Sequence, residues 1–194
     1  MGFSVHLNVQ LKFYNLPKNK RHQPFYIGDE VKKYLMILRK REFLLYKIEN
    51  SNFTLLRVLR RAYSILLQYK MHKLGIKLGF DVPLNRIGPG FRIDHWGFLV
   101  INSKAKIGKD CHIFGDVTIG IKKDNIEGAP NIGDNVTIGA GSRILGPIKI
   151  ASNCVIGANA VVTHDFLEPG SIIVGIPAKK IGSLSEKINT HNNI

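Results

Sequence analysis

The stretch IGDNVTIGAGSRILGPIKIASNCVIGANAVV, residues 132–162, decides the fold, because an aliphatic side chain returns at every sixth position along it. This spacing fits neither the 3.6-residue period of a helix nor the two-residue alternation of an isolated strand. It fits a coil with three flat faces, in which each hexapeptide supplies one face and points its aliphatic residue inward. The spacing extends upstream, with a two-residue phase shift after residue 99 and an interruption at residues 122–131. The aliphatic positions are Ile87, Ile93, Leu99, Ile101, Ile107, Ile113, Ile119, Ile132, Ile138, Ile144, Ile150, Ile156 and Val162.

The residue two positions before an aliphatic residue should also point inward, because strand side chains alternate. These positions hold small or β-branched residues: Ala105, Cys111, Val117, Val136, Ser142, Cys154 and Ala160. The two cysteines are therefore interpreted as buried packing residues in a reducing compartment, not as a disulfide or a nucleophile. Glycine after the aliphatic residue permits a turn at which φ is positive. With about 18 residues to a coil, residues 86–166 supply about four to five coils.

The first 80 residues read differently, as an irregular and helical basic region. One helix is expected over residues 29–48, and a second from an N-cap at Ser51 to Lys73, with Gly75 as its stop. Residues 1–28 look irregular, residues 81–182 form the repeat domain, and residues 183–194 form a loose polar tail. The second helix carries apolar residues at helical spacing: Leu55, Leu56, Leu59, Ala62, Tyr63, Leu66 and Leu67.

Charge is concentrated in that first region. Residues 1–80 hold 16 Lys and Arg against 4 Asp and Glu, whereas residues 81–194 hold 12 against 10. No nucleic-acid-binding motif accompanies the charge, so nucleic acid is not the expected partner. Two interpretations stay open for the basic residues Arg39–Arg41, Arg57, Arg60 and Arg61. They dock on an anionic membrane surface, or they are solvated on helices packed against the prism or partner subunits. With no apolar run of about 18 residues and no secretory signal visible, a cytoplasmic protein is expected, possible membrane contact being peripheral.

The segment IDHWGFLVIN, residues 93–102, resembles the Asp-His-x-x-Gly segment of serine acetyltransferases and a similar segment of polysaccharide O-acetyltransferases. Both belong to the hexapeptide-repeat acyltransferases. The resemblance covers about half of the chain and implies a mainly β fold, a left-handed parallel β-helix of hexapeptide repeats with an N-terminal helical segment. It also implies acetyl-CoA as the acyl donor, a homotrimer, and no metal; no His/Cys/Asp spacing here is typical of a metal site.

From spacing alone His95 falls at a corner of the prism, where a histidine can simply be exposed. The resemblance makes it the general base, a role that suits an imidazole titrating near neutral pH. Asp94 matches the carboxylate that orients the ring, and Asp81 is the nearest candidate for a second aspartate, one residue out of register. Trp96 could stack on a sugar acceptor or pack locally. His112 is expected to point outward, and His164 is expected on the surface, neither with a catalytic role.

The acetyl-CoA wall of the family resembles IGAGSRILG (residues 138–146) and IGANAVV (residues 156–162). The positions that match it are Ala140 and Ala158, with Gly120 at the loop entrance. Lys179, with Lys180, is the candidate for the 3′-phosphate of the donor. The alternative is that these are turn residues of the repeat and a solvated basic end.

The acceptor is where the chain departs from serine acetyltransferases. Those enzymes carry Arg-His-Pro-Lys-Ile at the loop, where this chain reads GAPNI, so Ala129 replaces a histidine that the family associates with the amino-acid substrate. The N-terminal helical region also looks shorter than the helical domain that is typical of serine acetyltransferases. The expected acceptor is therefore a sugar hydroxyl in surface polysaccharide synthesis. The alternatives are serine acetyltransferase and a hexapeptide-repeat scaffold that binds but does not catalyse.

Overall fold

The computed structural model describes residues 30–122 and 128–185, and the chain divides into two compact units, residues 1–80 and 81–194. The expectations for residues 1–28, for the middle of the interruption at 122–131 and for most of the tail lie outside the described residues.

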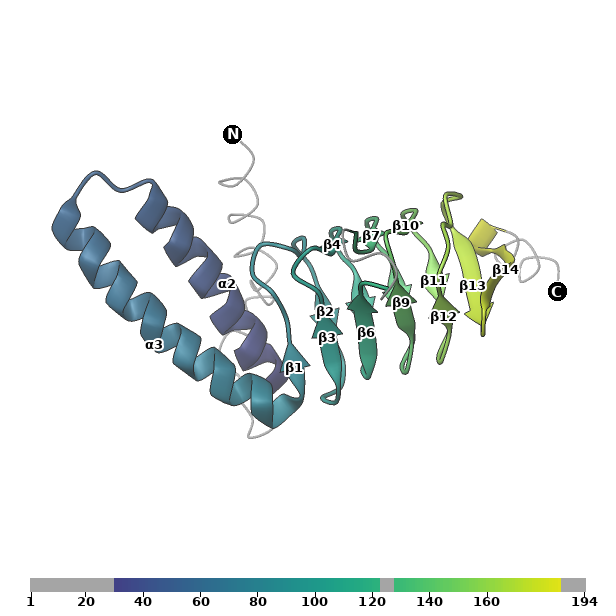
Figure 1. Ribbon diagram of the computed structural model, residues 1–194, viewed down its shortest axis with the longest axis horizontal. Coiled ribbons are helices and arrows are strands. Elements are labelled where there is room, and N and C mark those ends of the chain that lie inside the picture. The colour runs from purple at the N-terminus through teal and green to yellow at the C-terminus, as the bar shows by residue number, and fades with distance from the viewer. Residues whose placement is uncertain (1–29, 123–127, 186–194) are drawn as a thin grey trace, which may run out of the picture. The chain divides into compact units, whose positions relative to one another are not determined.

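The described part of unit 1, residues 30–80, contains two helices, α2 (Glu30–Glu49) and α3 (Thr54–Leu78), which pack side by side (Figure 1). The first prediction, a helix over 29–48, is confirmed. The Tyr34 and Phe80 rings meet edge to face with centroids 5.3 Å apart, which ties α2 to the end of α3. The buried side chains of α2 are Val31, Tyr34, Leu35, Leu38 and Ile48, and the buried residues of α3 are Ser64, Leu67, Met71, Gly75 and Leu78.

The predicted ends of the second helix are wrong. The helix begins after Phe53, whose backbone is extended and whose side chain makes no cap hydrogen bond, so Ser51 is not the N-cap. Gly75 lies inside the helix, which continues to Leu78. A Cβ at this position would stand 2.8 Å from the Phe80 carbonyl oxygen, so the site requires glycine. Its glycine therefore serves close packing and not termination. The helix ends at Gly79, which adopts φ 77° and donates its N–H to the carbonyls of Gly75 and Ile76.

The apolar face of α3 does not join the core of unit 1. Leu55 is 72% exposed and Leu66 is 58% exposed, and of the seven apolar residues predicted at helical spacing Leu67 is the buried one. An exposed apolar row of this length is typical of a surface that contacts something else.

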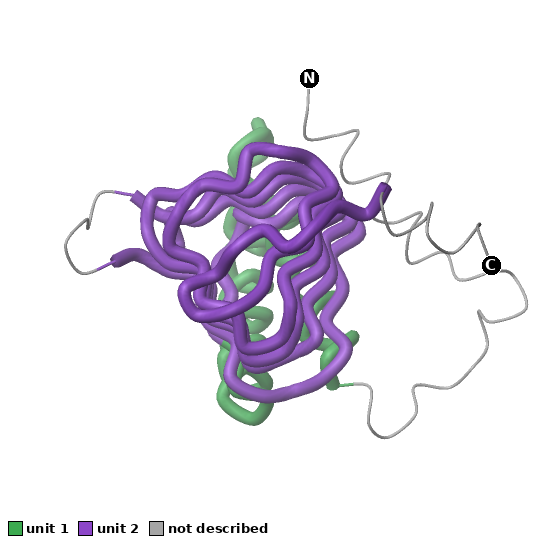
Figure 2. The backbone as a smooth tube through the Cα atoms, turned by 90° about the vertical axis from the view of Figure 1, so that its right-hand side faces the viewer, with its two compact units in different colours: residues 1–80 green, residues 81–194 purple. Residues whose placement is uncertain are grey.

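Unit 2 is a stack of short strands in three parallel sheets. One holds β3 (Leu99–Ile101), β6 (Val117–Gly120), β9 (Arg143–Leu145) and β12 (Val161–Val162) in that order, and β1 (Phe80–Asp81) spans the boundary between the units. The second holds β4 (Lys106–Ile107), β7 (Asn131–Ile132) and β10 (Lys149–Ile150). The third holds β2 (Arg92–Ile93), β5 (His112–Ile113), β8 (Thr137–Ile138), β11 (Val155–Ile156) and β13 (Ser171–Gly175), and β14 (Ala178–Ser183) closes it as an antiparallel edge. Figure 2 shows the coils superimposed as a three-sided tube.

The register between coils confirms the predicted repeat. Ile101 lies opposite Ile119, and Ile138 opposite Ile156, 18 residues further on in each case. The two-residue phase shift lengthens the step from Ile93 to Ile113 to 20 residues. All thirteen predicted aliphatic positions are buried, and so are the seven small positions that precede them. The core of unit 2 is therefore the column of side chains along the axis of the coils.

Glycine follows the aliphatic residue for a different reason from the one predicted. A Cβ on Gly139 would stand 2.5 Å from the backbone nitrogen of Ala158 in the next coil, so close stacking excludes a side chain there. Positive φ falls instead on Asn and Asp at the corners, such as Asn135 at 54° and Asn159 at 57°. These residue types tolerate the left-handed region because their short polar side chains bond locally.

Both cysteines are free and fully buried, which confirms that they pack in the core. The Cys111 Sγ lies 3.2 Å from the Gly133 carbonyl oxygen, to which the thiol donates. Burial raises the pKa of the Cys111 thiol to about 11, so the reactive thiolate is disfavoured at neutral pH.

Candidate active site

His95 lies at the corner between β2 and β3, and its side chain is exposed, as predicted from the spacing. A Cβ on Gly115, in the next coil, would stand 3.5 Å from the His95 Cβ, so the histidine rests against a residue without a side chain. Two further exposed rings follow it, Trp96 at 71% and Phe98 at 57% exposure. The imidazole is thus accessible and bordered by aromatic surface.

The residues beneath His95 are small. The register places the inward isoleucines of β2, β5, β8 and β11 opposite one another, so the residues two positions later share one edge of the prism. Backbone hydrogen bonds join this edge, with Gly141 N–H donating to the Gly115 carbonyl (3.2 Å) and Asn159 N–H to the Ala140 carbonyl (2.8 Å). We call it the His95 edge; its residues are His95, Gly115, Ala140 and Ala158. It presents one imidazole above a strip of backbone with little side-chain cover.

Lys179 lies at the C-terminal end of the same edge. In β13, Ile173 lies opposite Ile156, which puts Gly175 below Ala158. Gly175 pairs with Ala178 across the β13–β14 hairpin, and Lys179 follows. Lys180 forms an ion pair with Glu168 at 2.6 Å.

Gly120 lies elsewhere. It ends β6, at the border of the sheet away from the His95 corner, and accepts the Gly146 N–H through its carbonyl at 2.9 Å. Of the four residues predicted for the donor, Ala140 and Ala158 belong to the His95 edge, Lys179 lies beyond its C-terminal end, and Gly120 lies on another edge.

Asp94 pairs with neighbours other than His95. Its Oδ2 lies 2.8 Å from the His112 Nε2 and its Oδ1 lies 3.4 Å from the Arg92 Nε. Within the described residues its carboxylate makes no ion pair or hydrogen bond with His95, because the register stacks it above β5. Orientation of His95 by Asp94 therefore stays a prediction. Asp81 is exposed in β1, and within the described residues it forms no ion pair with His95.

His112 completes a cluster that sequence reasoning missed. The Arg92 Nη2 lies 2.9 Å from the His112 Nδ1. A guanidinium can only donate a hydrogen bond, so Nδ1 is the acceptor, and the neutral ring then carries its proton on Nε2. That Nε2 is buried and close to Asp94, although the carboxylate oxygen lies off the N–H direction. The ring also packs on Phe114, with centroids 4.5 Å apart. His112 does point outward from the prism, as predicted. The 20-residue spacing between Arg92 and His112 was the feature of the sequence that could have predicted its contact with Arg92 and Asp94.

A matched pair of variants measures this cluster, which we call the Arg92–Asp94–His112 cluster. His164 stacks on Phe166 at 4.6 Å and 37°, much as His112 stacks on Phe114 at 4.5 Å and 41°. His112→Ala and His164→Ala both lose this ring stacking, but the His112 side chain is 14% exposed whereas His164 is exposed, so His112→Ala also removes more buried ring surface. We expect His112→Ala to lower the free energy of unfolding by about 1 kcal/mol more, because Asp94 and Arg92 lose a partner. Urea unfolding followed by circular dichroism measures the difference, and equal losses would contradict the cluster's contribution.

In the stretches 30–122 and 128–185, no three His, Cys, Asp or Glu side chains gather closely enough to hold a metal ion, and no helix is long and apolar enough to cross a membrane.

Comparison with known proteins agrees with the repeated coils of unit 2. Residues 129–164 match the family model for the bacterial transferase hexapeptide (six repeats). These residues are hexapeptide repeats. The serine acetyltransferase of Mycobacterium tuberculosis is 42% identical over 110 residues, which make up 55% of this chain and 47% of that protein. The hexapeptide-repeat chain thus spans about half the length of this curated relative, and the predicted resemblance to serine acetyltransferases is confirmed.

Two solved structures share the fold. Serine acetyltransferase from Neisseria gonorrhoeae in complex with serine aligns with a TM-score of 0.60 and 27% identity, over 92% of this chain and 69% of that one. Serine acetyltransferase in complex with coenzyme A from Brucella abortus strain S19 aligns with a TM-score of 0.61 and 24% identity, over 93% and 68%. At 24% identity the second likeness shows the fold alone.

Proposed function

We propose that this protein is an acetyl-CoA-dependent O-acetyltransferase. The observation that carries the proposal is the His95 edge, an accessible imidazole above a strip of small residues on a hexapeptide-repeat wall. The relative at 42% identity is a serine acetyltransferase, and so is the similar structure at 27% identity. The left-handed sense of the β-helix, which the resemblance implies, is part of the same proposal.

In this mechanism His95 accepts the hydroxyl proton of the acceptor as its oxygen attacks the thioester carbonyl. A tetrahedral intermediate forms, and the carbon–sulfur bond then breaks. The imidazolium returns its proton to the departing coenzyme A thiolate, which leaves an ester and a free thiol. The intermediate's oxyanion needs a positioned donor, a role that we assign to a backbone N–H at a coil corner. The Arg92–Asp94–His112 cluster, on the strand leading into the corner, holds the backbone from which His95 projects.

The donor would lie along Ala140 and Ala158, with its 3′-phosphate toward Lys179. Gly120, which lies on another edge, is left out of this path. Ala158 is exposed, so a larger side chain should fit without unfolding the coil but should occupy the path of the pantetheine arm. We expect Ala158→Leu to raise the KM for acetyl-CoA about tenfold or more, which is the loss of about 1.4 kcal/mol of binding. Lys109→Leu, at an exposed corner on a different edge, is the control. Steady-state kinetics and thermal melts separate binding from folding, and an unchanged KM in Ala158→Leu would remove Ala158 from the donor site.

The comparisons favour L-serine as the acceptor, because the relative at 42% identity is a serine acetyltransferase and the structure at 27% identity is a serine acetyltransferase in complex with serine. None of these proteins supports the sugar acceptor of polysaccharide synthesis that the sequence led us to expect. L-serine is therefore the first acceptor in our proposal.

A sugar hydroxyl remains the second candidate because of two specific observations. Ala129 has no side chain that could bond the carboxylate of an amino acid. The Asp94 carboxylate is already paired with Arg92 and His112, so it is a weaker partner for an ammonium group than a free carboxylate would be. Both features suit an acceptor without a zwitterion, and Trp96 offers an exposed ring on which a sugar could stack.

A thiol-release assay with acetyl-CoA tests the proposal. L-serine should release coenzyme A faster than a panel of monosaccharides and nucleotide sugars does; the reverse order would transfer the proposal to the second candidate. Calorimetry with acetyl-CoA addresses the remaining alternative. A protein that binds acetyl-CoA without turnover on any acceptor, or that does not bind it, would be a scaffold and not a transferase.

We also propose that the active assembly is a homotrimer with the sites between neighbouring prisms. The exposed aromatic surface beside His95, formed by Trp96 and Phe98, supports this, since rings that large are more often covered than solvated in the working protein. A second wall against this surface would enclose the His95 edge and exclude water from the thioester.

A further inference from the structure

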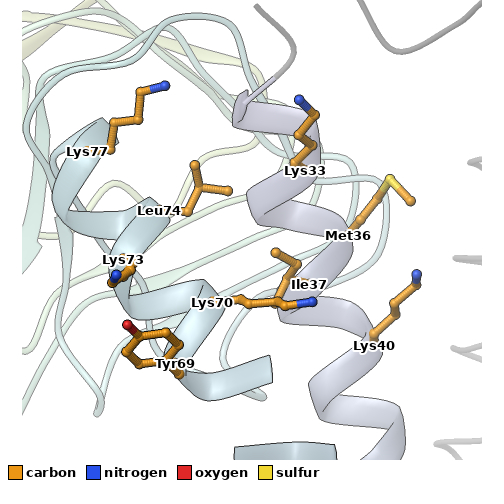
Figure 3. Close-up of a pocket in the computed structure, with 9 residues that line it drawn as sticks. All are labelled: Lys33, Met36, Ile37, Lys40, Tyr69, Lys70, Lys73, Leu74 and Lys77. Atoms are coloured by element: carbon orange, nitrogen blue, oxygen red, sulfur yellow. The ribbon is translucent and has the colours of Figure 1, made fainter. Parts of the chain in front are cut away.

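A groove runs between α2 and α3, with a volume of about 600 Å³, and its rim is cationic (Figure 3). Figure 3 shows Ile37 and Leu74 lying between the two helices, where they form an apolar floor. Met36 also lines the groove. The basic residues of the rim are Lys33, Lys40, Lys70, Lys73 and Lys77. We call this surface the lysine groove. It combines apolar and cationic contact in one place.

Most of this charge is not neutralised within the described residues. Lys77 pairs with Glu30 at 3.1 Å, and Lys73 lies over the Tyr69 ring, 4.9 Å from its centroid. In the parts of the chain that the structure describes, Lys33, Lys40 and Lys70 form no ion pair. Residues 30–80 hold 12 Lys and Arg against 3 Asp and Glu, so a positive field extends over the whole helical unit.

The lysine groove continues the exposed apolar face of α3. Leu59, Tyr63 and Leu66 are followed by Lys70, Lys73 and Lys77 at alternating steps of four and three residues, which is the spacing of one helix face. All six are exposed. Along one face, α3 therefore changes from bulky apolar side chains to amines. A surface of this composition matches the boundary of a lipid bilayer, where acyl chains and head groups lie side by side.

Charge decides among the possible occupants. Residues 1–29 hold four basic residues and one acidic residue, and a second copy of the chain carries the same cationic groove, so charge disfavours both the N-terminal segment and groove-to-groove pairing of two copies. An anionic partner is attracted, and the apolar floor selects an amphiphile. We propose that the lysine groove and the adjoining apolar face of α3 dock the protein on an anionic lipid bilayer. This inference stands apart from the proposed acetyl transfer.

Co-sedimentation of the full chain with vesicles tests the docking. We expect binding to phosphatidylcholine vesicles that contain phosphatidylglycerol and little binding to phosphatidylcholine alone. Raising the salt from about 0.1 M to about 1 M should release the protein, because screening shortens the reach of the lysines. The double variant Lys70→Glu, Lys73→Glu should bind at least about tenfold more weakly.

The matched control is Lys106→Glu, Lys149→Glu, two exposed lysines of unit 2 that give the same net charge; it should bind as the native chain does. Equal binding to both vesicle types, or equal loss in the two double variants, would overturn the proposal. So would a change of assembled mass in Lys70→Glu, Lys73→Glu by light scattering, which would mean that a second copy occupies the groove. Tighter binding to a DNA duplex than to anionic vesicles would overturn it as well. The thiol-release activity with soluble acceptors should not change in the groove variant, which keeps this test separate from that of the proposed reaction.

Discussion

His95→Ala is expected to lower kcat by about 10²–10⁴-fold, because it removes the base that accepts the hydroxyl proton as the thioester is attacked. The side chain is exposed and rests against Gly115, so its removal opens no cavity in the core. The thermal midpoint and the circular dichroism spectrum should therefore stay as they are in the native protein. A KM for acetyl-CoA close to the native value would place the loss in the chemical step.

His164→Ala supplies the control, since His164 is also exposed in unit 2 but lies away from the His95 edge. It should keep the native kcat. The pH profile of the native enzyme adds a second measurement. A base must be unprotonated to act, so kcat/KM should fall on the acid side of the profile, and this acid limb should vanish in the residual activity of His95→Ala. Near-native turnover by His95→Ala would remove the mechanism altogether.

The sequence was sufficient for the core of unit 2 because one physical rule sets it. A flat-sided coil needs an inward aliphatic residue at every sixth position, and side-chain alternation assigns a second inward position, so Ile138 and Cys154 could both be predicted as buried. His95 could be placed outside the core by the same counting. These predictions depend on neighbours within one coil, where the spacing is fixed.

Contacts between coils could not be predicted as well, because they depend on the register. Alternation correctly turns His112 outward but does not say that a 20-residue coil brings it beneath Arg92 and beside Asp94. Neither does it say that Gly139 must be glycine because the next coil stacks 2.5 Å from its missing Cβ. Each is a property of two coils together.

The predictions of the ends of α3 were wrong for a related reason. Gly75 has the residue type of a stop, but its missing side chain lets Phe80 approach, and a distant contact overrode the local preference. The apolar spacing of α3 was read correctly as one face, yet nothing in the spacing says what covers that face. Unit 1 buries a neighbouring face of α3 around Met71, which includes Leu67 at the border of the predicted row, and leaves Leu59 exposed.

Ile138→Ala is the substitution for which we expect the largest loss of stability, about 2–5 kcal/mol. Ile138 is fully buried in β8, between Ile113 of β5 and Ile156 of β11. Truncation removes its methyl and methylene groups from the column of side chains, and the two backbones above and below are held in place by their own hydrogen bonds, so the cavity cannot close. Stacked coils gain stability from each neighbour, and a defect in a middle coil weakens two contacts at once.

The control is Ile181→Ala, the same chemical change at a β14 residue that is 64% exposed. It should cost no more than about 0.5 kcal/mol, because the removed atoms already face water. Urea unfolding at one fixed protein concentration compares the two, since assembly would make the midpoint depend on concentration. Equal midpoints for both variants would mean that the inward column does not carry the stability of the β-helix. A much lower midpoint for Ile138→Ala alone locates that stability in the six-residue spacing from which the fold was predicted.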